Sequence, residues 1–153
     1  MAKYNRSRCV SLAQQLLQLR NTYPDLIDQI DISRSELRCL IRLQPTPESV
    51  IYKVRIGLRL GGTPTAQIIE PKNLAKVNGM KPHHLFNRSV DGKERLCVYY
   101  PKDHNWNNNS FLADSFIPWV ITWLSAYETW QITNLWVYPE CIDEKQKTNK
   151  NKE

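Results

Sequence analysis

ELRCLIRLQPTPESVIYKVRIGLRL, residues 36–60, decides the fold class, because apolar and polar residues alternate on both sides of a proline-marked turn. In residues 36–43, and again in residues 50–60, every second residue is apolar or tyrosine. Successive side chains of a strand point to opposite faces, so this period of two predicts two antiparallel strands with one packed face and one solvent-facing face. A glycine-proline turn at residues 61–64 leads into an apolar segment at 65–71, which predicts a third strand and therefore an antiparallel β-meander.

Apolar residues at helical spacing flank the meander on both sides. Residues 7–21 place leucines on one face and stop before Tyr23-Pro24, which predicts an N-terminal helix. Residues 111–132 carry a stripe of tryptophans, and Pro118 suits a first helical turn. We expect the stripe to fill one face of the sheet, with Trp119, Trp123 and Trp130 packed against Leu37, Ile41, Val54, Ile56 and Leu58. The predicted fold class is α+β, with an N-terminal helix, an antiparallel β-meander and a large apolar C-terminal helix.

The length of 153 residues fits one domain followed by a short tail. We assign residues 1–142 to the domain and expect residues 143–153 (DEKQKTNKNKE), which are wholly polar, to form a disordered tail. The apolar share of 41% excludes a chain that is disordered throughout. The apolar runs are shorter than the roughly 20 residues that a bilayer crossing needs. No signal-peptide pattern opens the chain, so we expect a cytoplasmic protein without membrane insertion.

The positive charge of the chain belongs mainly to the predicted domain. The net charge is +6, from 21 basic and 15 acidic residues, of which the tail holds four and three. The solvent-facing side of the meander is basic, which suits an acidic protein or a nucleic acid as partner. Surfaces that bind single strands normally combine basic with aromatic residues, and this predicted face has no aromatic residue. We therefore rank nucleic-acid binding last, although the face carries Arg38, Arg42, Lys53, Arg55 and Arg59.

The cysteines and histidines are not spaced like metal ligands. The four cysteines, at positions 9, 39, 97 and 141, form no CxxC pair, and two of the three histidines are adjacent. The sequence also contains no glycine-rich phosphate loop, no GxSxG motif and no HExxH motif. We expect neither a metal nor a cofactor.

Residues 71–110 break the regular pattern, with prolines, glycines and three consecutive asparagines around one apolar run, RLCVYYP at 95–101. A connection of this length inside a compact domain is usually functional. Cys97 lies within it, and we expect its thiol to be the most accessible of the four. An accessible thiol can act as a nucleophile through its thiolate, whereas Cys39 lies in a predicted core strand.

Six short motifs in and after this segment carry a resemblance to a known family. They are PHHLF (82–86), DG (91–92), LCVYYP (96–101), DHNW (103–106), IPW (117–119) and WLSAYETW (123–130). In this order they resemble the bacterial ubiquitin-conjugating-enzyme-like proteins of cyclic-oligonucleotide-based antiphage signalling (CBASS) operons, in the short form without an activating-enzyme domain. The chain departs from that pattern in two places: four residues separate the DG motif from Cys97, and NLWVYPECIDE (134–144) has no glycine or histidine.

The resemblance implies a ubiquitin-conjugating-enzyme-like fold and a cysteine that accepts the C-terminal acyl group of a protein as a thioester and passes it to an amine. Carried onto this sequence, the thioester cysteine is Cys97 and the upstream catalytic histidine is His84. Asp103 and Trp106 match the D-x-x-W motif and are expected to contact substrate, as is Asn87, whose amide is a second candidate donor to the oxyanion. The implied acyl donor is the C-terminus of the operon's nucleotidyltransferase, and the acceptor is a lysine or other amine on an unidentified target.

Several alternatives stay open at this stage. The same fold with an inert cysteine would be an adaptor that binds and regulates the nucleotidyltransferase. The oxyanion donor is His84, Asn87 or backbone N–H groups near Cys97, and His84 can instead order the loop by hydrogen bonding. Trp106 can be a loop anchor that packs on the C-terminal helix, and Asp103 a solvated turn residue.

Overall fold

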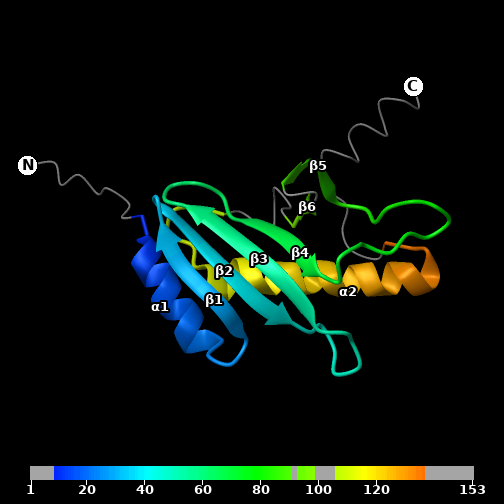
Figure 1. Ribbon diagram of the computed structural model, residues 1–153, viewed down its shortest axis with the longest axis horizontal. Coiled ribbons are helices and arrows are strands. Elements are labelled where there is room, and N and C mark those ends of the chain that lie inside the picture. Colours follow the sequence, from blue (N-terminus) through cyan, green and yellow to red (C-terminus); the bar gives the residue numbers. More distant parts are fainter. Residues whose placement is uncertain (1–8, 91–92, 99–105, 137–153) are drawn as a thin grey trace, which may run out of the picture.

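The computed structural model describes residues 9–90, 93–98 and 106–136 and confirms a mixed fold of helices and antiparallel sheet (Figure 1). The predicted tail at 143–153 lies outside the described residues. In chain order the elements are α1 (Leu12–Thr22), β1 (Ile27–Ser33), β2 (Glu36–Leu43), β3 (Tyr52–Arg59), β4 (Thr65–Glu70), β5 (Leu85–Val90), β6 (Lys93–Leu96), the π-helical turn η1 (Leu112–Phe116) and α2 (Ile117–Thr133).

The four strands β1 to β4 form one antiparallel sheet in sequence order, and the three predicted strands β2, β3 and β4 are confirmed. The sequence reading missed β1, which pairs with β2 at the edge of the sheet. A register shift between Ile27 and Gln29 interrupts the period of two in this strand, and none of its residues is fully buried. An irregular, mostly solvent-facing edge strand therefore gives little periodic signal.

The first helix begins later than predicted, at Leu12 instead of residue 7, because Ser11 caps it. The Ser11 hydroxyl accepts a hydrogen bond from the Gln14 backbone N–H at 3.1 Å, and the Gln14 side chain accepts one from the Ser11 N–H at 2.9 Å. This reciprocal capping box satisfies two N–H groups that have no partner inside a helix. Two side chains fasten the helix to the start of η1: Gln15 bonds Ser110 and Leu112, and Tyr23 bonds the Ala113 carbonyl.

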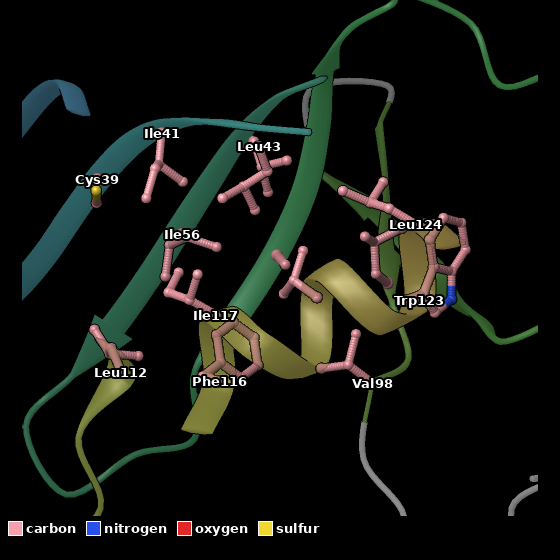
Figure 2. Close-up of a cluster of buried hydrophobic side chains, with 14 of the residues drawn as sticks. Cys39, Ile41, Leu43, Ile56, Val98, Leu112, Phe116, Ile117, Trp123 and Leu124 are labelled. Atoms are coloured by element: carbon pink, nitrogen blue, oxygen red, sulfur yellow. The ribbon is translucent and has the colours of Figure 1, made fainter. Parts of the chain in front are cut away.

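The hydrophobic core lies between one face of the sheet and α2, which runs along that face (Figures 1 and 2). All five sheet residues predicted for the packed face are buried. Trp123 and Trp130 are buried as expected, whereas Trp119 is only partly buried. Pro118 lies in the first turn of α2, where its missing N–H costs no hydrogen bond.

The description of residues 111–132 as one large apolar C-terminal helix is not supported. The α-helix itself has 17 residues, and a separate five-residue π-helical turn precedes it. Polar residues such as Thr122 and Ser125 share its partly buried positions, and its last turn, including Ile132, is exposed. Among the residues that the structure describes, no helix has the length and apolar character needed to cross a membrane.

Candidate functional site

The candidate site is built on the hairpin of β5 and β6, which lies against β4 beside the main sheet (Figure 1). The sequence reading expected this region to be irregular and missed both strands. The pairing within the hairpin is irregular. Leu85 pairs with Leu96 and Ser89 pairs with Glu94, so the segment of β5 between these pairs is two residues longer than the segment of β6. The extra residues between the DG motif and Cys97 belong to β6, so they extend the hairpin instead of moving the histidine away from the cysteine.

Cys97 follows β6 directly and is held between two buried neighbours. Leu96 and Val98 are each only 1% exposed, whereas Cys97 is half-buried. Figure 2 shows Val98 beside α2 within the core cluster. Because successive side chains of an extended segment point to opposite sides, the thiol of Cys97 faces away from the core.

The expectation that Cys97 is the most accessible thiol is wrong, because Cys9 is exposed and Cys97 is half-buried. Cys39 is buried in β2 as predicted, and burial raises the pKa of its thiol to about 12. A thiol with that pKa is almost entirely protonated near neutral pH and is a poor nucleophile. Cys141 lies outside the described residues. Position in the fold, and not exposure, therefore distinguishes Cys97 from Cys9 and Cys39.

The backbone of His84 joins Cys97 to the core. The His84 carbonyl accepts a hydrogen bond from the Cys97 N–H at 2.7 Å and a second one from the indole N–H of Trp123 at 3.1 Å. His84 has a φ of 57°, in the left-handed region that non-glycine residues seldom adopt. Two donors on one carbonyl hold this unfavourable conformation in place. The structure thus brings His84 and Cys97 together through the main chain.

The His84 side chain is 8% exposed and packs among aromatic rings. Its ring centre lies 5.4 Å from that of Trp136, a residue that follows α2. Trp136 also stands 5.4 Å from Trp123 in an edge-on arrangement. The chain reaches this position because Asn134 ends α2 in the left-handed conformation, with a φ of 59°, which reverses its direction. The sequence analysis gave no role to Trp136. The only signal for this turn was Asn134, which directly follows the helical pattern.

The three predicted substrate contacts are not brought together by the described structure. Asn87 lies on β5, where the structure describes the backbone only. Asp103 lies outside the described residues. Trp106 is a loop anchor: its indole N–H donates to the Gly62 carbonyl at 3.1 Å, in the turn between β3 and β4, and its ring packs against the hydrophobic core. Within the described ranges, no three His, Cys, Asp or Glu side chains gather as a possible metal site.

Two residues of the WLSAYETW motif, Tyr127 and Glu128, connect α2 to neighbouring segments by hydrogen bonds. The Tyr127 hydroxyl accepts a hydrogen bond from the Ala75 N–H at 2.6 Å, which ties the segment before β5 to α2. Glu128 accepts bonds from the hydroxyls of Ser49 at 2.8 Å and Tyr52 at 3.0 Å. Burial, together with the Glu128 carboxylate, raises the pKa of Tyr52, so its hydroxyl stays a donor. These motif residues are structural supports, and they fix α2 relative to the sheet and to the chain that leads into His84.

A comparison with family profiles identifies the family of this chain. No curated protein matches the chain. The family profile described as "Type II CBASS E2 protein" matches residues 15–143, which include most of α1, the whole sheet, the β5–β6 hairpin, Cys97 and α2. Because this match takes in most of the chain, the protein belongs to the family of type II CBASS E2 proteins, whose E2-like role lies in antiphage defence.

Proposed function

We propose that this protein carries an acyl group on Cys97. It accepts the activated C-terminal carboxyl group of the operon's cyclic-oligonucleotide nucleotidyltransferase as a thioester and transfers it to an amine. Family membership supports a conjugating role of this kind, and the order of helix, meander, hairpin and helix supports a ubiquitin-conjugating-enzyme-like fold. The observation that carries the chemistry is the placement of Cys97 between buried Leu96 and Val98, which directs its thiol away from the core.

The reaction has two acyl transfers. In the first, the Cys97 thiolate attacks the carbonyl carbon of a donor that arrives as an acyl adenylate or a thioester; the C–S bond forms, and the nucleotide or the donor thiolate leaves. In the second, an amine attacks the same carbon, the C–N bond forms, the C–S bond breaks and the amine loses a proton to a base. The donor must be activated beforehand, because a free carboxylate has no adequate leaving group.

Each transfer passes through a tetrahedral intermediate whose oxyanion needs hydrogen-bond donors. The N–H of Cys97 already donates to the His84 carbonyl, so this amide is occupied. The His84 imidazole, as the family resemblance implies, is our proposed oxyanion donor; the His84 backbone contacts Cys97, while its ring packs beside Trp136. Asn87, Asp103 and Trp106 remain proposed substrate contacts, with Asp103 orienting the incoming amine.

Incubation of the protein with an activated partner peptide tests this function. The probe is a peptide with the nucleotidyltransferase's C-terminal sequence, prepared as a thioester of mercaptoethanesulfonate. We expect intact-mass spectrometry to show one peptide acyl group added to the protein and removed by both hydroxylamine and dithiothreitol. A disulfide would yield to dithiothreitol alone. The same peptide with a free carboxylate, and a scrambled peptide thioester, serve as controls.

Two outcomes would contradict the proposal. Equal labelling by the scrambled thioester would mean that the thiol is merely reactive and does not recognise the donor. Tight binding of the nucleotidyltransferase without any adduct, even when the whole operon is co-expressed, would show that the protein is an inert adaptor.

Variants at His84 test its assigned role. His84→Ala should slow adduct formation by about 10²–10³-fold if the imidazole stabilises the oxyanion. His84→Asn should recover part of the rate, because an amide can donate and Asn tolerates the left-handed conformation. His83→Ala removes an exposed imidazole from the adjacent position and is the matched control. If His84 acts only through its backbone carbonyl, all three variants keep that group and will react at similar rates.

A further inference from the structure

A hollow of about 480 Å³ lies on the side of the sheet that faces away from α2. Residues that line it, such as Arg38 on β2 and Arg55 on β3, alternate along their strands with the buried residues of the core. Arg95 on β6 closes the hollow at the edge nearest the hairpin. Arg95 and Cys97 are two residues apart and both alternate with buried Leu96, so they face the same side of the chain.

Gly57 forms the floor of this hollow because it has no side chain. It pairs with Arg38 on one neighbouring strand and with Thr65 on the other. A Cβ atom at this position would lie 3.0 Å from the Thr65 hydroxyl oxygen and 3.5 Å from a carboxylate oxygen of Glu36. A larger residue would therefore fill the space that the three strands leave open.

Most cations on this face already have acidic partners. Asp28 pairs with Arg42 at 2.9 Å and with Lys53 at 3.7 Å. Glu36 pairs with Arg38 at 3.6 Å, and its oxygen lies 4.0 Å from Arg59. These ion pairs neutralise much of the positive charge on the face that was considered for nucleic-acid binding.

Arg95 differs from these cations. Among the described residues it forms no ion pair, and its Nε atom is buried without a hydrogen-bond partner. Leaving a buried N–H unsatisfied is costly. A guanidinium presents a planar fork of donors that matches a carboxylate. The side chain is thus equipped to bind an acceptor that enters the hollow.

We propose that this hollow binds an acidic side chain of the protein that donates the acyl group, with Arg95 as the principal contact. This inference rests on the proposed function, because it assigns the hollow to recognition of that donor. Among the described residues that line the hollow, three are arginines, two are acidic (Asp31 and Glu36) and none is aromatic. This positive excess without stacking side chains fits a carboxylate better than a nucleic acid. Bound there, the acidic residue would anchor the donor on the side of β6 to which the Cys97 thiol points.

Amide chemical shifts recorded with short peptide probes test the proposal without any acyl transfer. We expect a peptide that carries two glutamates to shift the amides of Gly57 and Thr65 in a saturable way, and the same peptide with glutamines to leave them unchanged. Arg95→Gln should weaken the binding of the glutamate peptide on the order of tenfold, as expected for loss of a charge-assisted, bidentate contact. Arg95→Lys should fall in between, since it keeps the charge but loses the fork.

Arg20→Gln is the matched control, because it removes the same charge from the last turn of α1, away from the hollow. An equal loss of affinity in Arg20→Gln would overturn the proposal in favour of general electrostatic attraction. Tighter binding of a uridine oligonucleotide at Gly57 and Thr65 would overturn it in favour of nucleic acid. Equal binding of inorganic phosphate would show a simple anion site without peptide recognition.

The same variants separate this proposal from the proposed function. Cys97→Ser should bind the glutamate peptide as the unaltered protein does. In adduct formation, Arg95→Gln should raise the donor concentration needed for half-maximal rate and leave the saturating rate nearly unchanged. If peptide binding is found and no adduct ever forms, the acyl-transfer function fails and the binding site stands. If adducts form with equal donor dependence in Arg95→Gln and the unaltered protein, the hollow is not part of donor recognition.

Discussion

Replacing Cys97 with Ser is expected to abolish the hydroxylamine-sensitive adduct, leaving either no product or an oxyester that reducing agents do not cleave. The serine hydroxyl is a far poorer nucleophile than a thiolate near neutral pH. The exchange is nearly isosteric at a half-buried position, so the melting temperature should hardly change. Intact-mass spectrometry after exposure to the peptide thioester, together with a thermal melt of the same sample, measures both effects.

Substitutions of the other thiols are the controls for this result. Cys9→Ser removes an exposed thiol and Cys39→Ser a buried one with a raised pKa, and neither should prevent the adduct. If the adduct disappears in Cys9→Ser and persists in Cys97→Ser, the nucleophile has been assigned to the wrong residue. A loss of several kcal/mol of stability in Cys97→Ser would instead identify a core thiol.

Replacing Trp123 with Ala is expected to lower the free energy of unfolding by about 3–5 kcal/mol, the range for deleting a large core aromatic residue. The Trp123 ring is buried and stacks on Tyr127, with ring centres 5.4 Å apart. The substitution also removes the indole N–H that donates to the His84 carbonyl. Chemical denaturation followed by far-ultraviolet circular dichroism measures the loss. A near-neutral result would contradict the assignment of Trp123 to the core.

Two further variants separate packing from hydrogen bonding at this position. Trp123→Phe keeps an aromatic ring and loses the N–H, so we expect a smaller loss of stability than in the alanine variant but slower adduct formation than in the unaltered protein. Trp119→Ala truncates a partly buried tryptophan on the same helix and should cost less than Trp123→Ala. Equal adduct rates for Trp123→Phe and the unaltered protein would show that the N–H does not help to position the site.

The parts of the fold that could be predicted from the sequence are those with a regular hydrophobic period. In β2 and β3, burial follows the alternation residue by residue, from Leu37 to Leu58. The hydrophobic period did not predict strands that are irregular or not fully buried, such as β1 with its register shift after Ile27. It also failed in β6, whose four residues are too few to show an alternation. The start of α1 was misplaced because the leucine pattern does not reveal which residue caps the helix.

The candidate site was only partly predictable, for a different reason. The motifs marked Cys97 and His84 as residues, but the contact between them runs through the main chain and depends on the pairing of β5 with β6. The bond from Trp123 to the same carbonyl joins residues 39 positions apart. Periodicity describes neighbours along one element, so it carries no information on such long-range contacts. Arg95 likewise gave no signal, because the burial of its Nε atom without a hydrogen-bond partner among the described residues exists only in the folded chain.

The His84 carbonyl accepts hydrogen bonds from both Cys97 and Trp123, which bears on how active members of the family can be recognised from sequence. The backbone N–H of Cys97 and the indole N–H of Trp123 donate to the same carbonyl, so the position of Cys97 depends on a tryptophan that is buried in the core. If Cys97 carries the acyl group as proposed, a homologue that keeps both Cys97 and His84 but has an aliphatic residue at position 123 should be impaired. On the proposed function, the tryptophan at position 123 therefore belongs with the cysteine and the histidine among the positions that identify an active family member.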